Sequence, residues 1–336
     1  MKTLTPSLPR AGWLRALAAG IALVAALPAA AQDKVQLQLN WFHLADHSPI
    51  YLALKKGYYK EENIELTVLR GSGSADSAKK IDLGQADVGI SDAPTLLTAI
   101  SKGANLKMVA VVFDKAGNNV FFRKTAAIKT PKDLVGKKIA VPPADSHRVL
   151  WPAFAQINGI DPNAVTLVNV KPEGKQAIVA AGEVDGAFDL YTSYAIWEKV
   201  LGKGDVGNLL WANFGLPIYG HTYFVNNDLI KKNPKLIEKF LRAAHKGWRD
   251  AKANPAASID AMVEMVPGLD GPTLLATMPQ ILDLCVTERS TKHGMGWIEP
   301  ELMQKTMDVT FATAKPEKPM ALADVFTNDY SSRIKP

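Results

Sequence analysis

The sequence predicts an α/β protein made of two lobes that are joined by a hinge of two chain crossings. Strands and helices alternate over residues 35–113, and the same alternation restarts over residues 120–190. The C-terminal part of the chain then has a helical pattern. A length of 336 residues also exceeds what one hydrophobic core usually serves, which favours two lobes.

The first predicted unit is a strand that leads through a loop into a helix. Apolar and polar residues alternate over residues 35–41, the period of a strand that is covered on one face. Ser48 is a suitable N-cap, Pro49 fits the first helical turn, and Gly57 can adopt the left-handed conformation that ends a helix. The loop between strand and helix therefore lies where open α/β sheets bind their ligands.

The rest of the first series repeats this unit. The Gly- and Ser-rich residues 71–74 separate a strand from a helix that ends near Gly84, and Asp92 is the N-cap of the following helix. We expect strands at residues 64–69, 86–90 and 106–113, and helices at residues 74–84 and 92–103.

The second series starts with a strand at residues 120–124 and a capped turn at Thr130 and Pro131. Strands follow at residues 138–141, 165–170 and 184–190, with helices between them. Residues 213–225 are typical of a crossing back to the first lobe.

The C-terminal helices are predicted to pack on the first lobe. One of them carries an i, i+4 apolar stripe of Leu236, Phe240, Ala244 and Trp248. The first lobe is therefore discontinuous, with residues 32–117 and 219–336, and the second lobe has residues 118–218. The crossings near residues 113–120 and 213–222 form the hinge.

Residues 1–31 have the three parts of a secretory signal. Basic residues come first, an apolar stretch covers residues 16–27, and small residues at 29–31 form a cleavage site, so Gln32 is expected to start the mature chain. The apolar stretch is short for a transmembrane helix. We expect export as a soluble protein into a bacterial periplasm.

Composition excludes several classes of function. Removal of the signal takes away three positive charges and lowers the net charge from +6 to +3, which is no footprint for nucleic acid. Cys285, the single cysteine, allows no disulfide within the chain and is expected in the core. The sequence has no phosphate loop, no G-x-S-x-G and no H-E-x-x-H, so we expect neither an enzyme, a metal site nor a cofactor.

Candidate binding residues follow from the rule that ligands bind at the carboxyl ends of strands. Trp41 offers a flat face for stacking, although a core position is an equal alternative. Arg148 and the amides of the helix near Ser146 can hold an anionic group, and hinge residues often face the ligand. The candidates are Trp41, Asp46, His47, Ser91, Asp92, Ser146, Arg148, Asp189, Tyr191, Tyr219 and His221.

Four segments in the same order resemble a known family. The run W-x5-H-x-P-I-Y-x-A-x3-G-Y-Y-K-E-E begins at Trp41, and VGISDAPTLLTAISKG, TPKDLVGKKIAV and GEVDGAF follow it. Together they resemble the periplasmic binding proteins similar to the thiamine-pyrimidine precursor, sulfonate and aromatic-acid binders. The resemblance places His47 at the loop histidine of that family and Glu198 at its acidic pocket residue.

The resemblance implies a type II periplasmic binding protein that captures a small organic ligand between its lobes. Such a protein delivers its ligand to an ABC transporter permease in the inner membrane, and we expect it to be a monomer. The ligand is expected to be aromatic or heteroaromatic, and an anionic group is compatible with Arg148. Pyrimidine, aromatic acid, sulfonate and flavin-like ligands stay open. The alternative is an enzyme on the same fold, such as a pyrimidine-precursor synthase.

Overall fold

The computed structural model describes residues 1–3, 32–312, 316–317 and 319–331. The predicted signal sequence falls almost entirely outside these residues. Within the described part of the chain, no helix has the length and apolar character needed to cross a membrane. Residues 33–336 form one unit, and the elements below belong to it.

The first sheet has five strands in the order β2-β1-β3-β10-β4. Strands β1 (Asp33–Gln38), β2 (Ile64–Leu69) and β3 (Val88–Asp92) run parallel, whereas β10 (His221–Asn226) pairs antiparallel with β3 and with β4 (Leu106–Val111). The strand of this sheet that comes last in the sequence, β10, thus lies inside the sheet rather than at its edge.

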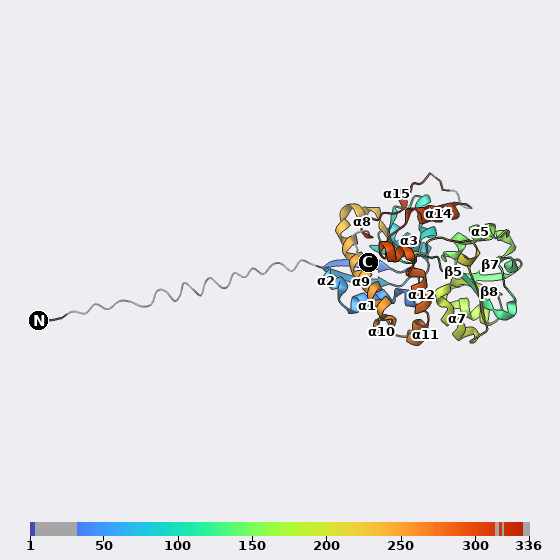
Figure 1. Ribbon diagram of the computed structural model, residues 1–336, viewed down its shortest axis with the longest axis horizontal. Coiled ribbons are helices and arrows are strands. Elements are labelled where there is room, and N and C mark those ends of the chain that lie inside the picture. The colour runs from blue at the N-terminus through green and yellow to red at the C-terminus, as the bar shows by residue number, and fades with distance from the viewer. Residues whose placement is uncertain (4–31, 313–315, 318, 332–336) are drawn as a thin grey trace. The chain divides into compact units, whose positions relative to one another are not determined.

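Helices cover both faces of the first sheet. One face packs against α1 (Ser48–Lys55), α9 (Pro234–Ala253), α10 (Pro255–Met265) and α12 (Met278–Cys285), and the other against α3 (Ser74–Asp82), α4 (Ala93–Ser101) and α14 (Pro300–Phe311). In Figure 1 the blue helix α1 and the orange helices α9 and α10 lie side by side, although most of the chain separates them. This lobe is therefore built from both ends of the sequence.

The second sheet has the order β7-β6-β8-β5-β9 and is contiguous in sequence. Its strands are β5 (Asn118–Arg123), β6 (Lys138–Val141), β7 (Thr166–Asn169), β8 (Gly186–Leu190) and β9 (Val206–Leu210). Two apolar clusters flank it, one with α5 (His147–Ile157) and one with α6 (Lys175–Ala180) and α7 (Tyr194–Leu201). The chain passes between the sheets twice, after β4 and after β9.

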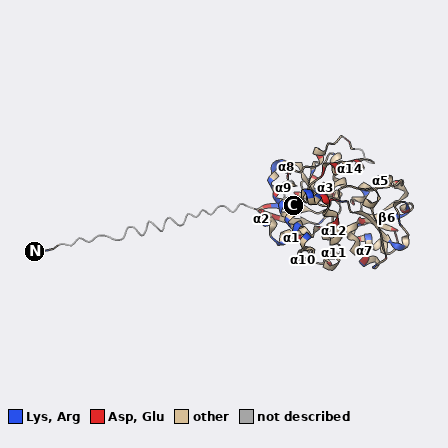
Figure 2. Ribbon diagram, viewed as in Figure 1, with Lys and Arg blue, Asp and Glu red and all other residues tan. Residues whose placement is uncertain are grey.

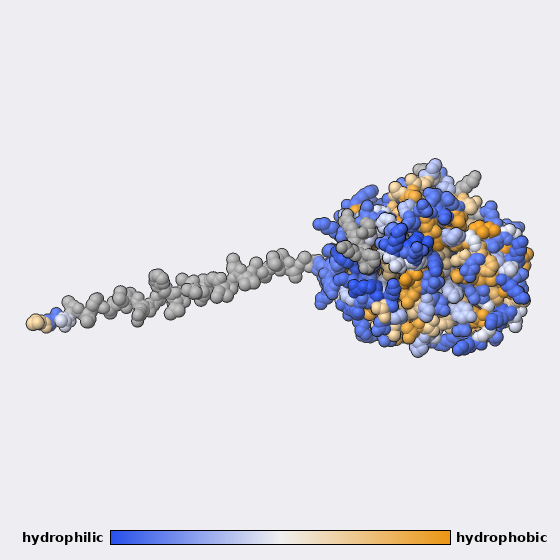
Figure 3. All heavy atoms as spheres, viewed as in Figure 1, coloured by the Kyte–Doolittle hydropathy of each residue, from blue (hydrophilic) through white to orange (hydrophobic). Residues whose placement is uncertain are grey.

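The remaining helices are short. They are α2 (Tyr58–Glu61), α8 (Asn227–Lys232), α11 (Gly271–Ala276), α13 (Glu288–His293) and α15 (Leu322–Val325). The segment after α15 docks on the first sheet, because Phe326 bridges to Met108 of β4. Basic and acidic residues occur in both lobes in Figure 2, and Figure 3 shows apolar groups scattered among polar ones on the visible face.

Most predicted elements are confirmed, and four details are corrected. The crossing back contains a true strand, β10, and residues before it form β9, which the sequence pattern did not predict. His47, not Ser48, is the N-cap of α1. Gln38 and Asn40 are buried, because helices cover both faces of the sheet and polar alternation does not mark a solvent face here. Neither sheet is wholly parallel, since β10 and β5 run against their neighbours.

Candidate ligand-binding site

A small pocket lies between the two sheets, where strands of both lobes end. Eleven residues line this inner pocket: Asn40, Trp41, Leu44, Ser74, Asp145, Ser146, His147, Lys175, Asp189, Leu190 and His221. Its free volume is about 30 Å³. That volume holds about one or two water molecules and no organic ring. Elements of both lobes therefore meet closely at this point.

Lys175 brings a positive charge into the inner pocket. Its side chain is only 1% exposed, and its Nζ lies 3.0 Å from Asp189 Oδ1 and 3.6 Å from Asp145 Oδ2. Nζ also donates a hydrogen bond to the carbonyl oxygen of Phe188 (3.1 Å). The same ammonium lies 4.8 Å from the centre of the Trp41 ring. Lys175 is thus paired within its own lobe and contacts the other lobe through an indole face.

The first lobe forms one side of the inner pocket, here called the first-lobe wall, with Asn40, Asp46, His47 and His221. A chain of hydrogen bonds fixes this wall. The backbone N–H of Leu44 donates to His47 Nδ1 (3.3 Å), so Nε2 carries the proton and donates to Asn40 Oδ1 (3.0 Å). The Asn40 amide in turn donates to His221 Nε2 (3.0 Å), which leaves His221 Nδ1 to face Asp46 Oδ2 at 3.5 Å. These hydrogen bonds hold the His47 ring in one tautomer and orient Asn40 at the pocket.

Burial governs the charge state of this wall. It lowers the pKa of His47 to about 4, against the opposing effect of Asp46, because the ring is 1% exposed. Burial alone would raise the pKa of Asp46, but the neighbouring His47 and His221 outweigh it and lower the pKa below its ordinary value. Near neutral pH the wall therefore carries an ionised Asp46 and a neutral His47.

The depressed pKa of His47 predicts acid sensitivity. The folded pKa of about 4 lies below the ordinary 6.5, so the unfolded chain takes up the proton first as the pH falls. The associated stability is present above pH 6.5 and is lost between pH 6.5 and 4. At pH 4.5 the loss is about 2 to 3 kcal/mol. Urea unfolding at pH 7 and pH 4.5 measures it.

The matched variant for this test is His47→Gln, which does not titrate. Its stability difference between the two pH values should be smaller than that of the wild type by the stated amount. His293→Gln is the control, because that ring belongs to α13 and does not line the inner pocket. Equal pH dependence in the wild type and His47→Gln would contradict the assignment.

Asp145 occupies the N-terminus of α5. Its Oδ1 accepts hydrogen bonds from the backbone N–H (3.0 Å) and from Nδ1 (2.6 Å) of His147. Burial would raise the pKa of Asp145, but His147 and Lys175 outweigh it and hold the pKa well below its usual range. The helix terminus that the sequence offers to an anionic ligand is already used by the protein's own carboxylate.

An open groove of about 420 Å³ adjoins the inner pocket. The first lobe contributes Trp41, Phe42 and Leu44, and the second lobe contributes residues of α6 and α7 such as Gln176 and Ile196. The inner pocket and this outer groove share Trp41, Leu44 and Asp189. These shared residues separate a wide, partly apolar entrance from a charged interior.

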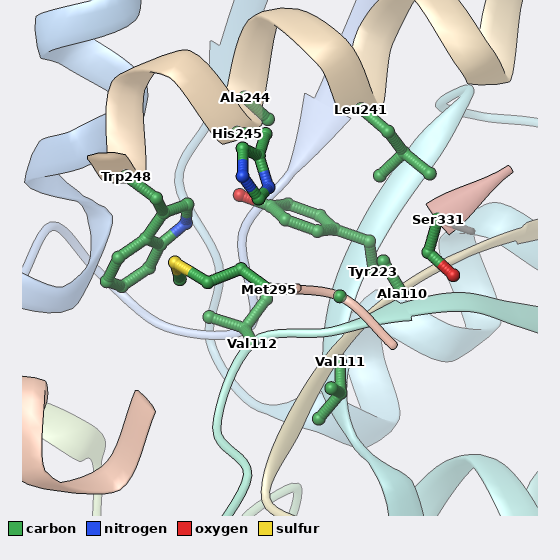
Figure 4. A pocket seen from close by; sticks show the side chains of 11 residues that line it. Ala110, Val111, Val112, Tyr223, Leu241, Ala244, His245, Trp248, Met295 and Ser331 are labelled. Atoms are coloured by element: carbon green, nitrogen blue, oxygen red, sulfur yellow. The ribbon is translucent and has the colours of Figure 1, made fainter. Parts of the chain in front are cut away.

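A different pocket lies within the first lobe, between its sheet and α9 (Figure 4). His245 and Trp248 extend from the helix, and the Tyr223 hydroxyl points toward them. Neither the hydroxyl nor Trp248 Nε1 has a hydrogen-bond partner among the described residues. The free volume of about 20 Å³ suits a water molecule rather than an organic ligand. The interlobe site is the better candidate, because the inner pocket, although also small, shares lining residues with the open outer groove.

The predicted site residues fall into three groups. Trp41, Ser146, Asp189 and His221 line the inner pocket. Asp46 and His47 belong to the first-lobe wall but not to the lining of the inner pocket. The other six belong to the lining of neither the inner pocket nor the outer groove: Ser91, Asp92, Arg148, Tyr191, Glu198 and Tyr219.

Several residues of the third group have structural partners. Arg148 donates from Nε and from a terminal guanidinium nitrogen to the carbonyl oxygens of Pro142 (2.9 Å) and Val141 (2.8 Å). Asp92 caps α4, where its Oδ1 accepts the N–H of Thr95 (3.0 Å). The Tyr219 hydroxyl accepts the N–H of Glu299 (2.7 Å). A position near the end of a strand therefore does not determine whether a side chain faces the pocket or forms hydrogen bonds within the protein.

Sequence reasoning missed Asn40 and Lys175. Asn40 continues the polar alternation of β1 and was assigned to an exposed face. Lys175 is the first residue of α6, where a positive charge opposes the helix dipole. That unfavourable position was the available signal that Lys175 has a compensating partner.

Residues 44–258 match the family model described as NMT1/THI5 like. The chain belongs to this family. Among curated relatives, the NMT1/THI5-like chain is similar to the formylaminopyrimidine-binding protein of Halalkalibacterium halodurans, with 22% identity over 300 residues that cover 89% of this chain and 91% of the relative. It is also similar to the 4-amino-5-hydroxymethyl-2-methylpyrimidine phosphate synthase THI12 of Saccharomyces cerevisiae, with 26% identity over 249 residues that cover 71% and 73%.

Among solved structures, the NMT1/THI5-like chain is similar to the alkanesulfonate-binding protein SsuA from Xanthomonas axonopodis pv. citri bound to MOPS. The TM-score is 0.67 at 18% identity, and the match covers 88% of this chain and 98% of SsuA. This likeness confirms the predicted periplasmic binding protein fold.

Proposed function

We propose that this protein is a periplasmic solute-binding protein that captures a small organic ligand between its lobes and delivers it to an ABC importer. The observation that supports this most is the inner pocket, which both lobes line and which opens into the outer groove. Pockets lined by aromatic and converging polar groups at domain interfaces are typical ligand sites. The family, the fold and the predicted signal sequence are consistent with this function.

The pocket residues favour a flat ring with N–H donors. Trp41 offers a face for stacking, and Asp145 and Asp189 accept hydrogen bonds. An anionic group has less support, because the amides at the start of α5 are used by Asp145 and Arg148 donates to carbonyl oxygens. An aromatic or heteroaromatic ligand, neutral or positively charged, is the class we propose.

We also propose that the lobes, residues 32–117 with 219–336 and residues 118–218, move about the two crossings. A free volume of about 30 Å³ requires the inner pocket to open before a ring can enter. Hinge motion of two lobes around a ligand is a common mode of closure.

A second candidate function is an enzyme on the same fold. The name of the yeast relative favours it, since that protein is a synthase. The buried histidine pair at the first-lobe wall offers groups that could take part in such chemistry. A synthase would be revealed by a bound cofactor or by a change in the mass of the polypeptide.

Native and denaturing mass spectrometry of the exported protein test the proposed function. We expect a monomer whose polypeptide mass corresponds to residues 32–336, with an organic molecule that is lost on denaturation. Retention of residues 1–31 would contradict export. A covalent change of the polypeptide, or a tightly bound cofactor, would favour the enzyme. The protein refolded without ligand is the control for the mass difference.

A further inference from the structure

We propose that Lys175 is a tethered occupant of the ligand site. Its ammonium fills the position on the Trp41 indole that a positively charged group of the ligand takes, and it thereby holds the lobes closed before ligand binds. This inference rests on the proposed function, because it concerns how the same site selects and admits its ligand.

The contacts of Lys175 divide cleanly between the lobes. Its anionic partners, Asp145 and Asp189, and the Phe188 carbonyl belong to the second lobe, whereas Trp41 belongs to the first. If the lobes separate, the ammonium keeps its charge partners and loses only the indole. The cation–π contact is therefore the part of this cluster that reports closure and stabilises it.

The burial of Lys175 is a feature that a merely structural lysine would not need. Lysine is rarely fully buried, and a lysine at the first position of a helix opposes the helix dipole. Lys175 nevertheless is 1% exposed at the start of α6. Two carboxylates and an aromatic face form a ready site for an organic cation, and the chain supplies that cation itself.

The charges around the inner pocket define the ligand that can displace Lys175. Asp145 and Asp189 line the pocket, and Asp46 belongs to the first-lobe wall, with its Oδ1 unpartnered among the described residues. The Lys175 ammonium lies near the carboxylates of Asp189 and Asp145 only. A ligand with a positively charged or N–H-rich group can replace the ammonium on Trp41, whereas an anion would add to the negative charge already there.

The test measures lobe separation without any ligand. Nitroxide labels on Ser72→Cys and Lys171→Cys, two exposed positions, flank the Arg70–Glu173 ion pair that bridges the lobes. Cys285 is 1% exposed and will not be labelled. Pulsed electron paramagnetic resonance then gives the populations of short (closed) and long (open) distances.

Lys175→Ala is expected to lower the ratio of closed to open protein by roughly two- to thirty-fold, the range for loss of one cation–π contact. Trp41→Leu should also lower the ratio of closed to open protein, while it leaves the charge partners of Lys175 in place. It can therefore replace Lys175→Ala in the test if that variant fails to fold. Lys199→Ala is the matched control, because it removes an exposed ion pair with Asp270 on another part of the interface.

Chemical rescue gives the decisive result. n-Propylammonium replaces the atoms that Lys175→Ala lacks, and it should restore the short distance in that variant but not in Trp41→Leu. Propionate and 1-propanol should not restore it. Wild-type distances in both variants, or equal rescue by propionate, would overturn the proposal. Since no natural ligand enters this experiment, its failure leaves the proposed function to be judged by mass spectrometry.

Discussion

Gly71→Ala is expected to destabilise the protein by about 1 to 3 kcal/mol, the range for forced overpacking of a tight contact. A Cβ at this position would lie 2.1 Å from the Leu39 carbonyl oxygen and 2.6 Å from the Trp41 nitrogen. Both neighbours are backbone atoms, which cannot rotate away. The Gly71 N–H also donates to the Trp41 carbonyl (2.9 Å), so the two segments are held together.

The same substitution should displace Asn40 and Trp41 and thereby weaken ligand binding. Urea unfolding measures the first effect, and retention of the co-purified molecule in native mass spectrometry measures the second. Gly271→Ala is the control, because its Cβ would meet only the side chains of Val263 at 3.4 Å and Ile259 at 3.9 Å, which are ordinary contact distances. A stability of Gly71→Ala equal to that of the control would show that the strand end tolerates movement.

Asp189→Ala is expected to cost about 3 to 5 kcal/mol, the usual effect of breaking a buried ion pair from one side. The change leaves Lys175 with one carboxylate partner, the more distant Asp145 (3.6 Å). It also removes the acceptor of the Trp197 indole N–H (3.0 Å) and of the Leu190 backbone N–H (2.9 Å). Several buried donors therefore lose a partner at once.

The control for Asp189→Ala is Glu173→Ala, which breaks an exposed ion pair with Arg70. Exposed pairs contribute between 0 and about 1 kcal/mol, so this variant should unfold close to the wild type. The double variant Asp189→Ala, Lys175→Met is informative as well, because it removes the stranded charge. It should recover part of the lost stability, and a further loss would indicate that the pair is not the cause.

The sequence predicts best those helices and strands whose pattern lies in residues that are neighbours in the chain. The strand at residues 64–69 and the cap of α4 at Asp92 depend on neighbouring residues, and both are confirmed. β10 was taken for a crossing although residues 222–225 favour a strand, because its pairing partners β3 and β4 lie far away in the sequence. Polar residues such as Gln38 lie buried because elements distant in sequence cover them.

The site was predictable to the extent that strand ends define it. Trp41 and Asp189 were predicted by that rule, and both line the inner pocket and the outer groove. Lys175 was not, because its partners come from β8, from the loop before α5 and from the other lobe. Side-chain pairing across lobes leaves little trace in a local pattern.

The place of β10 between β3 and β4 in the first sheet has a consequence for the order in which the protein folds. β4 pairs with β10 in this sheet, and β10 follows the entire second lobe in sequence. A chain that has emerged only as far as β9 has the complete second sheet, but its β3 and β4 have no strand to join them. We therefore expect the second lobe to fold first as the chain emerges, and the first lobe to stay open to proteases and chaperones until His221–Asn226 arrives.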